Sequence, residues 1–334
     1  MKKPLAKLFT AAVVLAGIHG SAHALTLGTD FLSYAATSIG SVPGLPVNYG
    51  GLTVKAGDTS TLLIGGAANG ASGLIYEIGV TRDGSNHITG FTGVAAAVGT
   101  VGAYNDGGVT YGPGGVLFTS RWPVNELGQT EPGSTGEDKI IDLAALGVAG
   151  SHSAVNFVPA GFGGAGHMKL VSWGGGQWYD ALYSPDGSGT YDITSVTQID
   201  LDPVAAGTQN LVGGPEGFVF IAAGNAGFAV NSLLVSDYSS GRVSAYDLDV
   251  NGDPLVTTRR DFLTGLSGAE GATIDPLTGD FLFSTFGGGS QVVVVQGFRA
   301  PDPDPDPPHG VPEPATLILF GAALMGLGAV RRRP

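Results

Sequence analysis

The chain repeats one plan about every 55 residues, and this period constrains the fold more than any other feature. Each copy opens with a glycine at the start of a short run, and the five glycines are Gly51, Gly108, Gly161, Gly217 and Gly271. A turn follows, and then a second apolar run whose second residue is always leucine, at Leu63, Leu117, Leu170, Leu234 and Leu282. A recurring period of this length indicates one supersecondary unit copied along the chain.

Each unit has the strands of a propeller blade. Third runs read LIYEIGV, KIIDLAA, QWYDALY, RVSAYDL and SQVVVVQ, and fourth runs read HITGFTG, SAVNFVP, YDITSVTQI and LVTTRRDF. Four short strands per unit are typical of a β-propeller. The 57 glycines and 20 prolines disfavour long helices. We therefore predict an all-β body, with a β-sandwich as the alternative to a propeller.

The number of blades follows from how the ring closes. Unit five has no fourth strand of its own, because the PDPDPDPP run at 301–308 cannot donate ladder hydrogen bonds. The N-terminal stretch 25–38 could supply that strand, which would leave no exposed sheet edge. Five blades are favoured, and six remain the alternative if residues 25–49 build part of another blade.

Two stretches carry a resemblance at the level of single blades. GAEGATIDPLTGDFLFST and SGRVSAYDLDVNGDPL resemble blades of the NHL, gluconolactonase and lactonase-type propellers, over most of residues 50–298. Those families include both hydrolases and binding scaffolds, so the resemblance implies a fold and leaves the activity open.

Residues 1–24 read as a secretory signal peptide with a helical apolar region. It has a basic start, an apolar stretch at 8–18 and an A-x-A cleavage site at Ala22 and Ala24. Signal peptidase is therefore an expected partner, and the mature chain should begin near Leu25. No cysteine is present, so an oxidising compartment would add no disulfides.

The body of the chain is strongly acidic. Residues 25–308 hold 9 Lys or Arg against 27 Asp or Glu, a net charge of −18. Such a surface repels phosphate backbones, which excludes nucleic acid as a partner.

The C-terminal end of the chain consists of a linker followed by a short terminal motif. Residues 25–299 form the predicted propeller domain, and 300–311 are an Asp/Pro-rich linker expected to be extended. Residues 312–334 contain Pro312, Glu313 and Pro314, an apolar run, and a basic end made of Arg331, Arg332 and Arg333. The apolar run 315–330 would span about 24 Å as a helix, against roughly 30 Å of bilayer hydrocarbon. A short transmembrane helix of this kind suits a temporary anchor.

These three parts, in this order, closely resemble the PEP-CTERM sorting signal of Gram-negative bacteria. The resemblance implies that an exosortase recognises Pro312–Pro314 and removes the helix, often in cells that make exopolysaccharide. It also implies transient insertion in the inner membrane, and a final place at the cell surface or in the extracellular matrix.

The repeat places one set of candidate ligand-binding residues on one face. Asp106, Glu216 and Glu270 stand one or two residues before a repeat glycine, which predicts a position at the mouth of the central channel. Trp122, Trp173 and Trp178 follow second strands and are expected on the same face, beside a long insertion at 121–138. Aromatic rings beside carboxylates suit a sugar; the alternative is that the tryptophans pack between blades.

A second candidate site is the DLDVNGD stretch. Asp247, Asp249, Asn251 and Asp253 alternate as in the first half of a calcium loop, but Thr258 stands where a bidentate glutamate is expected. Asn251-Gly252 also suits the turn of an ordinary hairpin. This stretch can therefore be interpreted as a calcium-binding loop or as an ordinary hairpin.

These features favour an exported binding or scaffold protein, with polysaccharide as the candidate ligand and no assigned catalytic residue. The alternative is a metal-dependent hydrolase, lactonase-like or glycosidase-like, that acts at the channel mouth. His152 and His167 lie in glycine-rich stretches and are expected to face solvent.

Overall fold

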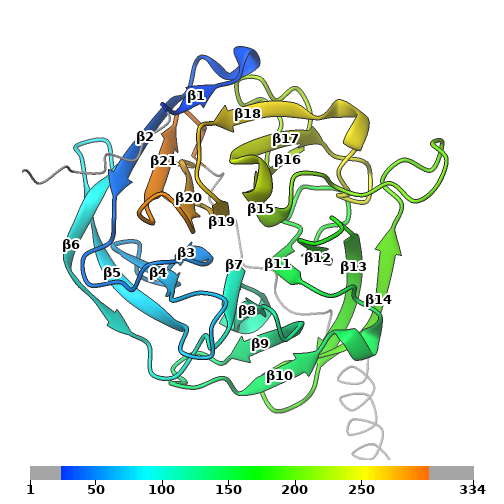
Figure 1. Cartoon of the computed structure of the whole chain (residues 1–334), viewed down its shortest axis with the longest axis horizontal. Helices are drawn as coiled ribbons and strands as arrows, with labels where there is room; N and C mark the ends of the chain where they lie inside the picture. Colours follow the sequence, from blue (N-terminus) through cyan, green and yellow to red (C-terminus); the bar gives the residue numbers. More distant parts are fainter. Residues whose placement is uncertain (1–23, 301–334) are drawn as a thin grey trace, which may run out of the picture.

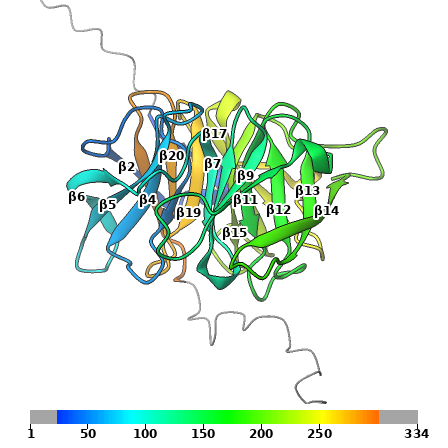
Figure 2. The same ribbon diagram turned by 90° about the horizontal axis from the view of Figure 1, so that it is seen from below.

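The computed structural model describes residues 24–300, which form five antiparallel sheets arranged as a ring around one axis (Figure 1). Each sheet is one propeller blade, and its strands run between the two faces of the ring (Figure 2). The prediction of a five-bladed propeller is confirmed.

Blade one contains β3 (Leu52–Val54), β4 (Thr61–Gly66), β5 (Leu74–Arg82) and β6 (Ile88–Ala97). Blade two contains β7 (Asn105–Tyr111), β8 (Leu117–Arg121), β9 (Glu126–Thr130) and β10 (Lys139–Asp142). Blade three contains β11 (His152–Phe157), β12 (Met168–Ser172), β13 (Trp178–Pro185) and β14 (Tyr191–Ile199).

Blade four contains β15 (Pro215–Ile221), β16 (Ser232–Asp237), β17 (Arg242–Asp247) and β18 (Arg260–Thr264), with the short β1 (Thr26–Leu27) added at its edge. Blade five contains β19 (Ala269–Ile274), β20 (Phe281–Thr285), β21 (Val292–Gln296) and β2 (Ala35–Gly40). Five single-turn 3-10 helices lie in the connections: η1 (Thr29–Phe31), η2 (Pro113–Gly115), η3 (Ala144–Leu146), η4 (Tyr238–Ser240) and η5 (Val256–Thr258).

The N-terminal segment closes the ring, as the sequence predicted. β2 is the outer strand of blade five, where Ala35 pairs with Gln296 and Thr37 with Val294. In Figure 1 the blue β2 lies beside the orange β21. The preceding β1 pairs with β18 of blade four through Thr26 and Thr264, so the segment holds two blades together.

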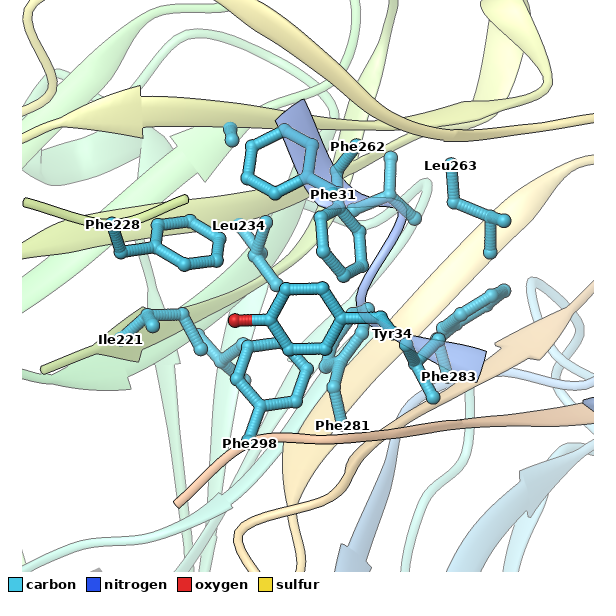
Figure 3. Packing of buried hydrophobic residues seen from close by; sticks show 14 of the residues in the cluster. Phe31, Tyr34, Ile221, Phe228, Leu234, Phe262, Leu263, Phe281, Phe283 and Phe298 are labelled. Carbon is cyan, nitrogen blue, oxygen red and sulfur yellow. The ribbon is translucent and has the colours of Figure 1, made fainter. Parts of the chain in front are cut away.

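Large apolar side chains fill the spaces between blades. All five repeat leucines are buried, because the second strand of each blade is covered on both sides by its neighbours. The largest cluster lies between blades four and five and is rich in aromatic rings (Figure 3). There Phe31 lies 5.0 Å from Phe262, and Tyr34 lies 4.4 Å from Phe298, measured between ring centroids.

Two blade boundaries differ from the prediction. The inner strand of blade three is β11, which the sequence analysis had taken for the last strand of blade two, and Gly161 lies in the following loop. In blade two the KIID stretch is the fourth strand, because the polar β9 supplies the third. The expected insertion at 121–138 therefore contains a strand instead of one long loop.

The predicted terminal helices lie outside the described residues. The apolar part of the signal peptide and the sorting signal at 312–334 fall there, as does nearly all of the linker. Within residues 24–300, no helix is long and apolar enough to cross a membrane.

The ring has two distinct faces. We call the face where the inner strands β3, β7, β11, β15 and β19 begin the top face, and the opposite one the bottom face. Ala24 lies beside Gly265, in the loop that leads into β19 on the top face. The chain leaves the ring on the bottom face, where Arg299 lies beside Gly279 in the turn between β19 and β20.

Candidate functional site on the propeller axis

Three carboxylates converge on the axis of the ring. Asp106, Glu216 and Glu270 each offer one oxygen, and these oxygens lie within 4.8 Å of one another. They come from the inner strands of blades two, four and five. Their exposed fractions are 1%, 6% and 0%, so the three carboxylates are enclosed along the axis. The sequence had suggested instead that they line the open mouth of the channel.

The repeat explains why these residues meet. In each of blades two to five, the first residue after the second strand donates its backbone N–H to a carbonyl just before the inner strand. Blade one makes the same bond from Ala68 to Asn48. Two residues beyond each acceptor lies the position that faces the axis, and the five such residues are Gly50, Asp106, Ser153, Glu216 and Glu270.

Glycine at the inner strands lets the blades approach closely at the centre. A Cβ on Gly107 would lie 2.3 Å from the Glu216 carbonyl oxygen, and one on Gly271 would lie 2.4 Å from the Cα of Gly51. No side chain fits at such distances, so the inner strands are in near contact and shut the three carboxylates off from solvent.

The three carboxylates are short of partners. Asp106 Oδ2, Glu216 Oε2 and both carboxylate oxygens of Glu270 are buried and accept no hydrogen bond from a donor group of the described residues. Asp106 lies within hydrogen-bonding distance of Glu216 and of Glu270, so these acids can pair with one another only by sharing a proton. The Asn69 side chain, oriented with its nitrogen toward the cluster, donates to Asp106 Oδ1 at 2.8 Å.

Burial makes ionisation of the cluster unfavourable. It raises the pKa of Asp106 to about 7. Burial and then the charges of Asp106 and Glu270 raise the pKa of Glu216. The pKa of Glu270 rises through burial and the charge of Asp106. A positive charge at the centre of the cluster would make ionisation of the three carboxyl groups more favourable.

Half-buried aromatic side chains surround the axis on the top face. Each is the first residue after a second strand, and together they form what we call the aromatic collar: Trp122, Trp173, Tyr238 and Phe286. The ring centroids of Trp173 and Tyr238 are 6.4 Å apart, and those of Tyr238 and Phe286 are 5.9 Å apart. Three adjacent blades thus contribute a continuous row of rings.

Glycines on the next blade make room for the collar. A Cβ on Gly214 would lie 2.7 Å from Trp173 Nε1, and one on Gly268 would lie 2.9 Å from the Tyr238 ring. Burial raises the pKa of Tyr238, and the charges of Glu270, Glu216 and Asp106 raise it further. The phenol therefore lies within electrostatic reach of the carboxylates below the collar.

The predicted aromatic residues separate in the structure. Trp122 and Trp173 lie on the top face in the collar, but Trp178 is fully buried between blades three and four. Its Nε1 donates to Asp253 Oδ1 at 2.8 Å, and its ring lies 4.7 Å from that of Phe218. Trp178 is thus a core residue, and the prediction that it lies on the binding face is wrong.

The sequence analysis missed Tyr238 and Phe286. Both occupy the position of Trp122 and Trp173 in the repeat, directly after the LLVSD and FLFST second strands. Aligning the five second strands and reading the next residue would have found them.

The DLDVNGD stretch folds as a hairpin. Asp249 Oδ1 accepts hydrogen bonds from the backbone N–H of Asn251 at 2.8 Å and of Asp253 at 2.9 Å. Asp247 pairs with Arg260 at 2.9 Å, and Asp253 accepts from the Lys169 ammonium at 2.6 Å. These acids are directed at donors in different places, and the one group of gathered ligand atoms within residues 24–300 is the axial cluster.

His152 is also placed differently from the expectation. It is fully buried at the start of β11, and neither ring nitrogen has a hydrogen-bond partner within the described part of the chain. Burial lowers its pKa to about 4, so the ring is neutral at physiological pH. His167 is exposed and lies 2.8 Å from Asp180.

Two grooves lie away from the axial site. One of about 470 Å³ follows β1 and β18 beside Asp30 and Arg260. Another of about 280 Å³ separates blades one and two, with Tyr111 and the Lys55–Glu77 ion pair in its walls. Neither groove is lined by a collar residue or an axial carboxylate. The candidate site is therefore identified by its carboxylates and aromatic rings and not by the size of a groove.

The fold and the site define a five-bladed propeller with an axial carboxylate cluster under an aromatic collar. Residues 310–333 match the PEP-CTERM protein-sorting motif, which confirms the resemblance seen in the sequence. The motif implies processing by an exosortase, and export to the cell surface or the extracellular space.

Solved structures with similar architecture cover most of the ring at low sequence identity. An auxiliary nutrient binding protein from Bacteroides thetaiotaomicron is 11% identical and has a TM-score of 0.44, with 78% of this chain and 76% of that chain covered. The calcium structure of a carbohydrate-active enzyme from Trichoderma reesei is 11% identical, with a TM-score of 0.43 and coverage of 83% and 98%. Virginiamycin B lyase from Staphylococcus aureus is 13% identical, with a TM-score of 0.39 and coverage of 79% and 99%.

No curated protein is detectably similar to this chain in sequence. At these identities and TM-scores, the solved structures do not bear on activity.

Proposed function

We propose that the chain is an exported binding protein whose aromatic collar holds a carbohydrate polymer on the top face. The observation that carries this proposal is the row Trp173, Tyr238 and Phe286, whose ring centroids follow one another at 6.4 and 5.9 Å. Aromatic faces stack on the apolar C–H surfaces of sugars. Neighbouring rings of this row meet edge to face, at interplanar angles of 82° and 75°, so each ring would stack on its own sugar unit and not share one flat platform with its neighbour. Exopolysaccharide is the candidate ligand, in line with the exported location.

The same proposal includes the processing of both ends. Signal peptidase would cut after Ala24, and residues 315–330 would anchor the chain transiently in the inner membrane. An exosortase would then remove this helix. The propeller would be released at the surface or into the matrix.

The hydrolase alternative gains no support from the described residues. A glycosidase needs carboxylates that reach the scissile bond, and the three axial acids are at most 6% exposed. The collar offers binding surface without an accessible acid, which favours a binding role.

Binding of purified protein to a panel of polysaccharides, including exopolysaccharide of the producing cells, tests the proposal. Trp173→Ala and Tyr238→Ala should each weaken binding about tenfold or more, equivalent to about 1.4 kcal/mol. Phe162→Ala is the matched control, because Phe162 is a half-buried aromatic on the bottom face, 5.8 Å from Phe220. Equal affinity of the collar variants and wild type, or equal loss in the control, would contradict the collar as the binding surface.

A further inference from the structure

A buried group of acids with no counter-charge needs an explanation. In the axial cluster one oxygen of each of three carboxylates lies within 4.8 Å of the others, and no ion pair joins any of the three to a Lys, Arg or His of residues 24–300. Other buried acids in the ring do have cationic partners: Asp253 pairs with Lys169 at 2.6 Å, and Asp275 with Arg82 at 2.5 Å. The axial cluster therefore differs from the ordinary ion pairs of this fold.

The unpartnered oxygens lie inside the cluster itself. Glu270 is 0% exposed, and neither of its carboxylate oxygens has a hydrogen-bond partner in the described part of the chain. One oxygen each of Asp106 and Glu216 is in the same state. Buried polar atoms are nearly always paired, so four unpaired oxygens in one place indicate a ligand that supplies positive charge.

The donor set suits a hard divalent cation. Ca²⁺ binds oxygen ligands at 2.3–2.6 Å, so two oxygens on one ion lie no more than about 5 Å apart. The three axial oxygens satisfy this limit. The cluster contains no thiolate or imidazole, the ligands that softer transition metals prefer. Glu270, with both oxygens free, has the capacity to bind in bidentate fashion.

We propose that Asp106, Glu216 and Glu270 bind one Ca²⁺ on the propeller axis. The ion links the inner strands of blades two, four and five, and so stabilises the ring from its centre. This chain has no cysteine, so no disulfide can do the same. The site lies below the collar, and it does not depend on the proposed carbohydrate binding.

The test uses the full chain after chelator treatment, with CaCl2 added in a calorimetric titration and in thermal unfolding. Wild-type protein should bind one Ca²⁺ per chain and unfold at a higher temperature when the ion is present. Glu270→Gln and Asp106→Asn should each bind Ca²⁺ at least tenfold more weakly and show no thermal shift.

Two controls distinguish this site from the other candidates. Asp249→Asn alters the DLDVNGD hairpin and should bind Ca²⁺ like wild type. Trp173→Ala should also keep its Ca²⁺, which separates this proposal from the proposed function. Without Ca²⁺, Glu270→Gln should be at least as stable as wild type, because an uncharged amide replaces a buried carboxyl group that lacks a counter-charge. With Ca²⁺ the order should reverse, and a merely structural role of Glu270 does not predict that reversal.

Three results would overturn the proposal. The first is the absence of binding heat and of thermal shift in folded wild-type protein. The second is full Ca²⁺ affinity in both Glu270→Gln and Asp106→Asn. The third is loss of Ca²⁺ binding in Asp249→Asn alone, which would move the ion to the hairpin.

Discussion

Two serines on second strands connect neighbouring blades through single hydroxyl groups. Ser120 Oγ accepts from the backbone N–H of Gly108 at 2.8 Å and donates to the carbonyl of Ser153 at 2.6 Å. Ser284 Oγ accepts from the backbone N–H of Gly271 at 3.0 Å and donates to the carbonyl of Gly50, just before the inner strand of blade one, at 2.5 Å. Each hydroxyl pairs buried backbone groups on two blades, which would otherwise remain unsatisfied.

His152 should make stability depend on pH. Its pKa is lowered to about 4 in the folded protein, from an ordinary value of 6.5 for an exposed histidine. Between these values the unfolded chain binds a proton that the folded protein does not, so the free energy of unfolding falls as pH drops from about 6.5 to about 4. The total loss should be on the order of a few kcal/mol.

Denaturant unfolding across this pH range, in wild type and in His152→Leu, measures the effect. The variant keeps an apolar side chain in the buried space but has no proton to bind. Its stability should therefore fall less steeply toward pH 4. Parallel curves for the two proteins would show that His152 does not cause the dependence.

At the scale of elements, the N-terminal segment stabilises the closed ring. β1 joins blade four, β2 completes blade five, and the residues between them place aromatic rings in the largest cluster. Phe31 is 0% exposed and lies 5.1 Å from Phe228, between ring centroids (Figure 3).

Phe31→Ala should lower the free energy of unfolding by about 3–5 kcal/mol, because a large cavity would open between two blades. The neighbouring Leu32 is 71% exposed, so Leu32→Ala should change stability by no more than about 0.5 kcal/mol. Thermal or denaturant unfolding measures both. Similar stabilities for the two variants would mean that the segment is not part of the closing contact.

Blade three shows where strand assignment from sequence fails. Its inner strand β11 reads HSAVNF and has no repeat glycine, whereas the loop after it contains GFGGAG. Local pattern favoured the glycine-rich stretch. The pairing of Val155 with Leu170 settles the assignment, and that contact is not local.

At the scale of the whole molecule, the site and the C-terminal exit lie on opposite faces. The collar is on the top face, and the chain leaves from the bottom face beside Gly279. A propeller held by its C-terminal segment would thus present the collar away from the point of attachment, where a polymer could reach it.

Processing of the sorting motif predicts a mass difference. Protein extracted from the cell surface should lack the peptide that contains Arg331–Arg333, because an exosortase would have removed it. Glu313→Ala changes the centre of the Pro-Glu-Pro motif and should leave this peptide in place. Mass spectrometry of both proteins gives the result, and an intact C-terminus in surface-extracted wild type would contradict removal.

The sequence by itself determined the features that depend on local pattern. The period of glycine and leucine predicted five blades, the N-terminal strand was predicted to close the ring, and the last residues identified a sorting motif. Even the grouping of Asp106, Glu216 and Glu270 was predictable, because each stands at the start of the inner strand of its own blade.

Only the tertiary structure decided burial and contact across the ring. Trp178 and Trp173 are close in sequence, yet one is in the core and the other is in the collar. The enclosure of the axial acids depends on Gly107 of blade two meeting Glu216 of blade four. Such contacts join residues far apart in the chain, and the neighbours that exclude water from a side chain are set by the closed ring rather than by local pattern.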